Sequence, residues 1–112
     1  MPIQKADYST INFDDMAASI GLKPKHIPRL IESFVNETSS IMDVLLDSIQ
    51  KKDFEKIKQT AHSIKGSAGN LKFNEIYEMS KEMELAAMES DGDFEYKLYF
   101  DSIKSIIKTI PN

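Results

Sequence analysis

Residues 53–71 read DFEKIKQTAHSIKGSAGNL, and their apolar side chains recur at intervals of three and four positions. Such spacing is typical of one buried face of an α-helix, and Asp53 can cap its first turn. The buried face is expected to hold Phe54, Ile57, Ala61, Ile64, Ala68 and Leu71. His62 falls outside this face, so the sequence predicts a packed helix that exposes a histidine.

The exposed face of this helix is polar, basic and partly without side chains. Positions three, four and seven residues away from His62 lie on its side of the helix. These positions hold Lys58, Gln59, Lys65, Gly66 and Gly69. A glycine inside a helix costs roughly 1 kcal/mol relative to alanine. The two glycines beside His62 therefore indicate that a phosphate or another protein approaches the backbone there.

The rest of the chain also follows helical periodicity. Asn12 and Gly21 are typical of the two ends of a short helix, and Pro24 and Pro28 fit only at the start of the long helix that follows. The inward faces of the other three long helices are expected to hold Leu30, Phe34, Thr38, Ile41, Leu45 and Ile49, then Phe73, Ile76, Tyr77, Ser80, Met83 and Ala87, and finally Phe94, Leu98, Tyr99, Ile103, Ile106 and Ile110. Turns are expected at residues 70–72 and 90–93.

No segment shows the alternating pattern of a strand. The predicted fold is all-α: an antiparallel up-down-up-down four-helix bundle over about residues 25–110, with a short additional N-terminal helix over about 13–21. At 112 residues, the chain 1–112 is expected to form a single domain. A domain with one exposed reactive histidine needs no second copy, so we expect a monomer.

Composition narrows the classes of function. The chain has no cysteine, which excludes disulfides, thiolate metal sites and cysteine nucleophiles. A net charge of −4 argues against nucleic-acid binding. No apolar run approaches the roughly 20 residues of a membrane span, and the N-terminus lacks a signal-peptide pattern. We therefore expect a cytoplasmic protein whose partners include neither a membrane nor a nucleic acid.

His62 is the residue best suited to carry chemistry. An exposed imidazole nitrogen can attack phosphorus, and lysines one turn away can neutralise phosphoryl oxygens. A di-metal carboxylate site would need Glu-x-x-His pairs, but Gln59 precedes His62 at that spacing, and His26 is expected to be a surface residue. We therefore expect no metal site. A glycine-rich nucleotide loop is also missing from the sequence, which argues against a kinase activity of its own.

The segment Ala61–Leu71 resembles the signature of histidine-containing phosphotransfer (HPt) domains, which carry phosphoryl groups in bacterial multistep two-component signalling. The likeness extends to Phe34 in the preceding long helix, to Asp53 before the signature helix and to Glu84 in the helix after it. Many members have a glycine where this chain has Lys72, so the turn is expected to differ there.

This resemblance implies roles for individual residues and implies a partner. The residue at His62 would carry the phosphoryl group, Lys65 would help neutralise it, and Gly66 would allow a partner to approach closely, whereas position 69 varies in the family. The partner would be a response-regulator receiver domain, including one within a hybrid histidine kinase. Its acidic pocket would supply the aspartate and the magnesium ion, so no cofactor is expected on this chain.

Local charge supports such a partner. Four lysines make the signature helix and its end basic on an acidic protein, and opposite charge at a contact surface speeds association. They are Lys56, Lys58, Lys65 and Lys72. Pairing of the next helix about the turn at residues 70–72 is expected to place Lys81 roughly level with His62.

Two other functions stay open. The chain could be the N-terminal phosphate-accepting domain of a larger chemotaxis-type histidine kinase, which has a similar bundle and histidine motif. It could also be a helical interaction module that no longer transfers phosphate. The intact set of His62, Lys65 and Gly66 argues against the second alternative, because a degenerate copy would be free to lose it.

Overall fold

Helices form where the sequence predicts them. The computed structural model describes residues 3–111. Its elements are α1 (Phe13–Ile20), the 3-10 helix η1 (Pro24–His26), α2 (Ile27–Lys51), α3 (Phe54–Asn70), α4 (Asn74–Met88) and α5 (Tyr96–Thr109). These residues contain no strand. The prediction of an all-α fold is confirmed.

The predicted caps explain where two of the helices begin and where one ends. The side chain of Asn12 accepts a hydrogen bond from the backbone N–H of Asp15 at 3.0 Å, and that of Asp53 accepts one from the N–H of Lys56 at 3.1 Å. Gly21 ends α1 in the left-handed conformation, with φ of 73°. The two side-chain hydrogen bonds satisfy backbone N–H groups in the first turns of α1 and α3, which have no acceptor within the helix.

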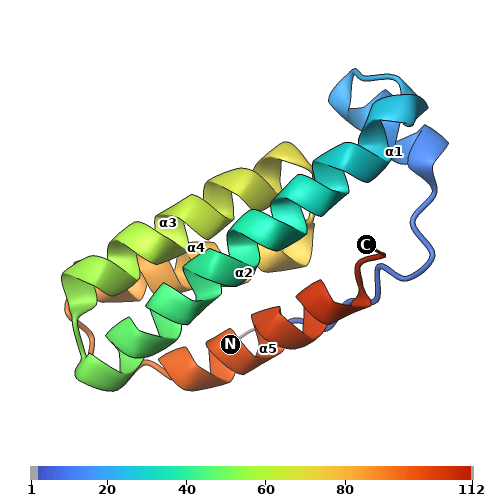
Figure 1. Ribbon diagram of the computed structural model, residues 1–112. Helices are drawn as coiled ribbons and strands as arrows, with labels where there is room; N and C mark the ends of the chain where they lie inside the picture. Colours follow the sequence, from blue (N-terminus) through green and yellow to red (C-terminus); the bar gives the residue numbers. More distant parts are fainter. Residues whose placement is uncertain (1–2, 112) are drawn as a thin grey trace.

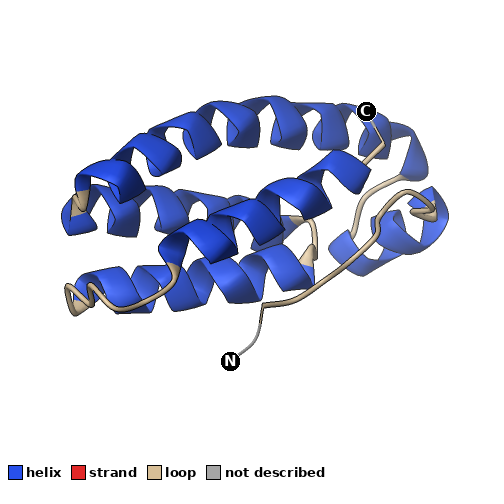
Figure 2. Ribbon diagram, turned by 90° about the horizontal axis from the view of Figure 1, so that it is seen from below, coloured by secondary structure: helices blue, strands red, loops and turns tan. Residues whose placement is uncertain are grey.

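The four long helices pack around a shared core. α3 lies against α2 and α4, and α5 closes the ring by contacting α2 and α4 (Figure 1). The short helix α1 lies at the end of the molecule where α2 begins. Figure 2 shows the N-terminal segment running beside α5, where the hydroxyl of Ser102 donates to the carbonyl of Gln4 at 2.8 Å. None of the described helices combines the length and the apolar character needed to cross a membrane.

The predicted buried face of α3 is confirmed apart from Phe54, which is half-buried, and α4 follows its prediction closely. In α2 the buried face is rotated slightly, because Ile31 and Met42 are buried while Leu30 and Ile41 are half-buried. Ile49 is half-buried as well, and Ser48 takes the buried position. The core therefore uses the predicted helices with a small error in rotation.

The prediction for α5 is wrong at Leu98, which is 49% exposed. The error arises because Phe94 precedes the helix, which begins only at Tyr96, so counting four residues from Phe94 does not follow a helical turn. The predicted burial of Tyr99, Ile103, Ile106 and Ile110 is confirmed. Tyr96, Phe100 and Ile107 complete the buried face, and Phe94 is half-buried.

Candidate functional site

The site forms on the hairpin of α3 and α4. Two pairs of residues face each other across it: Gly69 with Tyr77, and His62 with Glu84. Within each pair, the two residues are the same number of positions before and after Phe73. The two helices therefore run in opposite directions, and the chain reverses at Phe73. Gly69 permits this close approach, because a Cβ atom added there would lie only 3.1 Å from Cδ1 of Tyr77.

His62 stands on the surface of this hairpin. Ala61 and Ile64 are buried on either side of it in the sequence and fix the rotation of α3. The His62 side chain is 65% exposed, and its Nδ1 atom lies 2.7 Å from Oε2 of Glu84. Nε2 has no hydrogen bond with any of the described residues, so it is the ring nitrogen that a partner can reach.

Glu84 joins His62 to Lys65. The Glu84 side chain is 13% exposed, and its second oxygen, Oε1, lies 2.6 Å from Nζ of Lys65. Burial raises the pKa of Glu84, but hydrogen bonds from Lys65 and from His62 outweigh it and hold the pKa below its ordinary value of 4.5. At neutral pH Glu84 is therefore a carboxylate and can only accept hydrogen bonds. It follows that Nδ1 of His62 carries the proton that the two residues share.

The other residues expected at the site divide into three groups. Gly66 is exposed, and a Cβ atom added there would meet nothing within 4 Å, so the surface beside it is open. Gln59 is also exposed. Lys58 is directed elsewhere, because its Nζ atom pairs with Oε2 of Glu55 at 3.0 Å. Gly69 is half-buried and contacts Tyr77 of α4 as described above.

The contact between His62 and Glu84 was not predicted from the sequence. Lys81, which was expected roughly level with His62, lies three residues before the residue that contacts the ring, because the chain reverses about Phe73 and not about Leu71. Counting outward from Phe73 would have paired His62 with Glu84. The signal was present in the sequence, but the position of the reversal depends on how the turn is built.

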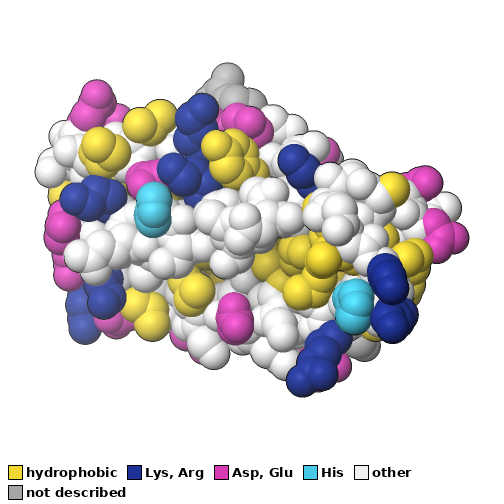
Figure 3. Space-filling model, turned by 90° about the horizontal axis from the view of Figure 1, so that it is seen from above, with side chains coloured by type: hydrophobic (Ala, Val, Ile, Leu, Met, Phe, Trp, Pro, Cys, Tyr) yellow, Lys and Arg dark blue, Asp and Glu magenta, His cyan; other side chains and the backbone are white. Residues whose placement is uncertain are grey.

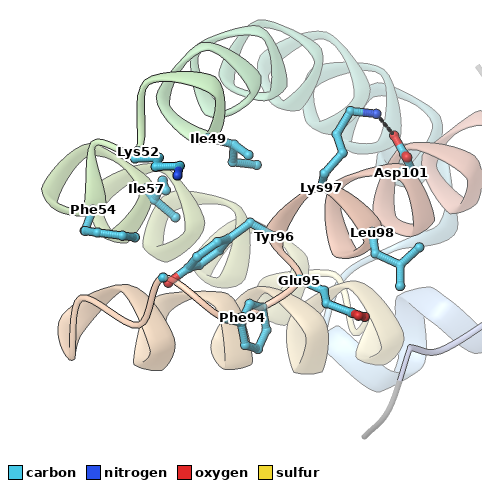
Figure 4. A pocket seen from close by; sticks show the side chains of 11 residues that line it. Ile49, Lys52, Phe54, Ile57, Phe94, Glu95, Tyr96, Lys97, Leu98 and Asp101 are labelled. Carbon is cyan, nitrogen blue, oxygen red and sulfur yellow. Dashed lines mark hydrogen bonds and ion pairs between the residues drawn. The ribbon is translucent and has the colours of Figure 1, made fainter.

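A well-formed cleft among the described residues lies away from His62. A cleft of about 520 Å³ opens at the far end of α3, lined by aromatic and aliphatic side chains that include Phe54, Phe94 and Tyr96 (Figure 4). Neither His62 nor Lys65 lines it. Small-molecule sites are concave, so an exposed histidine on a helix surface fits a protein partner better than a small substrate. Within residues 3–111, no three histidine or carboxylate side chains are grouped closely enough to hold a metal ion.

Comparison with known families agrees with this geometry. The family model of the Hpt domain matches residues 29–105, which is more than half of the chain. The chain belongs to the Hpt domain family. No curated protein and no solved structure matches it. Hpt domains act in two-component signalling as carriers of phosphoryl groups on histidine, not as kinases, and they interact with response-regulator receiver domains.

Proposed function

We propose that this Hpt domain accepts a phosphoryl group on Nε2 of His62 and exchanges it with the aspartate of a receiver domain. The observation that carries this proposal is the contact of 2.7 Å between Nδ1 of His62 and the carboxylate of Glu84. It holds an exposed ring by one nitrogen and leaves the other nitrogen directed away from that contact. Transfer between two proteins needs such a group at an accessible and fixed position.

The proposed transfer balances as follows. The lone pair on Nε2 of the neutral ring attacks the phosphorus of the aspartyl phosphate. A bond forms between Nε2 and phosphorus, the bond between phosphorus and the aspartate oxygen breaks, and the aspartate leaves as a carboxylate. The proton stays on Nδ1, so the phosphorylated ring is a cation. Glu84 stabilises that cation because its carboxylate already accepts the Nδ1 hydrogen bond.

Lys65 and Gly66 complete the proposed site. The ammonium of Lys65 shares Glu84 with the ring, so it is positioned near the phosphoryl oxygens that would arrive on His62. The open surface at Gly66 leaves room for the receiver. We assign Gln59 to the docking surface around His62 and Lys58 to its edge, where it pairs with Glu55. We assign Gly69 to the packing of α3 on α4.

The proposal also covers the domain organisation, the oligomeric state, the location and the cofactors of the protein. We take 1–112 as a single, monomeric domain in which consecutive long helices run up, down, up and down. Receivers, including those of hybrid histidine kinases, would meet it in the cytoplasm. The magnesium ion would come with the receiver, and this chain would hold no cofactor.

Two alternative functions of this domain remain open. If the domain is the N-terminal part of a chemotaxis-type histidine kinase, a dimerisation region and an ATP-binding region will follow it in the full gene product. If it is an interaction module without transfer, it will bind a receiver but take up no phosphoryl group.

Transfer from a labelled receiver tests the proposal. Wild type, His62→Gln and the control His26→Gln are incubated with a receiver that carries labelled phosphate on its aspartate. We expect label that is stable to base and labile to acid on wild type and on His26→Gln, and none on His62→Gln. Equal label on His62→Gln and wild type, or no label on wild type from a panel of receivers, would refute it.

A further inference from the structure

A second basic surface lies at the α1 end of the molecule. Lys23, Lys25 and Arg29 are exposed around η1 and the start of α2, together with His26. No acidic residue occurs between Met16 and Ile31, although the chain as a whole carries a net charge of −4. Within the described residues none of these cations forms an ion pair. We call Lys23, Lys25 and Arg29 the η1 basic patch.

The η1 basic patch is held in place by the fold. Pro24 begins η1 and Pro28 lies in the first turn of α2, and proline fixes the φ angle of the backbone. η1 also packs against α1 and α2. The backbone that carries the patch is therefore restrained, and its three cations form no ion pair with the described residues. Leu22 is 45% exposed beside it and adds an apolar group.

The patch lies on the same face as His62. Figure 3 shows both histidines on one face, with dark blue side chains on two sides of the histidine at the α1 end. The eight residues from His62 to the end of α3 at Asn70 span about 12 Å. Lys72 follows in the turn and lines a cleft with Asp15 and Ser19 of α1, so the end of α3 lies beside α1.

The length of about 12 Å from His62 to the end of α3 is less than the width of a protein interface. A standard interface buries about 800 Å² on each partner, which corresponds to a surface about 30 Å across. A receiver domain seated over His62 and displaced toward α1 would extend past the end of α3 toward the η1 basic patch. Charge favours that displacement, because a receiver with acidic groups around its aspartate pocket is attracted by unpaired cations and repelled by the acidic remainder of the chain.

We propose that the η1 basic patch is a second contact for the receiver domain, reading acidic side chains outside the receiver's aspartate pocket. This inference rests on the proposed function and adds the direction in which the partner is displaced from His62. The patch steers association and makes no contact with the transferred phosphoryl group.

A pair of charge-reversal variants tests the proposal. The double variant Lys25→Glu, Arg29→Glu removes the patch, and Lys104→Glu, Lys108→Glu is the matched control. The control makes the same change in net charge on two exposed positions in the C-terminal half of α5, next to a concave surface that α5 shares with α2. The rate of phosphoryl transfer from a receiver is measured by rapid mixing at low and high salt. Labelling by phosphoramidate, a small donor that needs no docking, is measured beside it.

We expect the patch variant to transfer about tenfold more slowly than wild type at low salt and to approach wild type at high salt, with the control within about twofold. Phosphoramidate should label all three proteins equally. Equal slowing of both variants, or no slowing of either, would overturn the proposal. So would loss of binding to phosphatidylserine vesicles in the patch variant with unchanged transfer, because the patch would then bind a membrane. Absence of any transfer to wild type would instead refute the proposed function.

Discussion

Nδ1 of His62 on α3 and Oε2 of Glu84 on α4 lie 2.7 Å apart, so the exposed histidine is fixed by the neighbouring helix and not by its own. The same carboxylate binds Lys65 through Oε1 at 2.6 Å. One side chain therefore contacts both the proposed nucleophile and the cation expected to neutralise the phosphoryl group. Its loss should affect stability and transfer together.

Two replacements of Glu84 separate its charge from its hydrogen bond. Glutamine keeps an oxygen that can accept from Nδ1 of His62, whereas alanine removes both contacts. We expect Glu84→Gln to slow transfer about tenfold and Glu84→Ala to slow it more, with about 1–2 kcal/mol lost from the free energy of unfolding in the alanine variant. Chemical denaturation and the transfer assay measure the two effects. Wild-type transfer in Glu84→Ala would show that the contact does not position the ring.

The lowered pKa of Glu84 predicts how stability depends on pH. Because the pKa in the folded state is below 4.5, the ionised group contributes stability above about pH 4.5 that is lost as the pH falls through the folded pKa. Glu84→Gln cannot lose this contribution, so its free energy of unfolding should fall less than that of wild type between about pH 6 and about pH 3. Denaturation at each pH measures the difference. Glu78→Gln, at an exposed position of the same helix, is the control and should follow wild type; parallel curves for all three proteins would contradict the prediction.

The two glycines of α3 should respond differently to alanine. Gly66→Ala places a Cβ atom in open space and should stabilise the helix by about 0.5–1 kcal/mol. Gly69→Ala places one 3.1 Å from Cδ1 of Tyr77, so the ring must move and the gain should be smaller or absent. Thermal unfolding compares them. A larger gain at Gly69 than at Gly66 would contradict the packing described for the hairpin.

A larger side chain at Gly66 tests its role in docking. Gly66→Leu should leave the helix folded and slow transfer from a receiver, because the new side chain blocks close approach. Circular dichroism and the transfer assay distinguish this outcome from unfolding. Loss of the folded state would make Gly66 a structural residue.

The backbone conformation of Lys72 in the turn between α3 and α4 lowers the stability of the folded state. Lys72 has a φ of 62°, a left-handed conformation in which a side chain costs about 1–2 kcal/mol and glycine costs little. We expect Lys72→Gly to raise the free energy of unfolding by about 1 kcal/mol and Lys72→Ala to leave it nearly unchanged, because alanine retains the Cβ atom. Urea denaturation of the two variants is the test. Equal stabilisation by both would mean that the charge of Lys72, and not its backbone, carries the cost.

Local sequence rules predicted most of the fold. The caps at Asn12 and Asp53 and the buried face of α3 depend on contacts within a few residues, and each is present in the structure. The exposure of His62 follows from the same face. The sequence could therefore place the proposed nucleophile and its neighbours in α3 with no knowledge of the other helices.

Contacts between helices were harder to predict. The pairing of His62 with Glu84 depends on where the chain reverses, and a shift of the reversal point from Leu71 to Phe73 brings a different residue of α4 beside the ring. Lys58 shares a helix face with His62 but pairs with Glu55, because two exposed side chains three residues apart can meet without help from the fold. Leu98 was misplaced because α5 begins after Phe94.

The position of phosphorus on the histidine ring is the most direct test of the central claim. The domain is labelled with ¹⁵N on histidine, phosphorylated by a receiver, and examined by NMR for coupling between phosphorus and a ring nitrogen. The account predicts coupling to Nε2 of His62, with Nδ1 still protonated against Glu84. Phosphorus on Nδ1 of His62, or on His26, would contradict it.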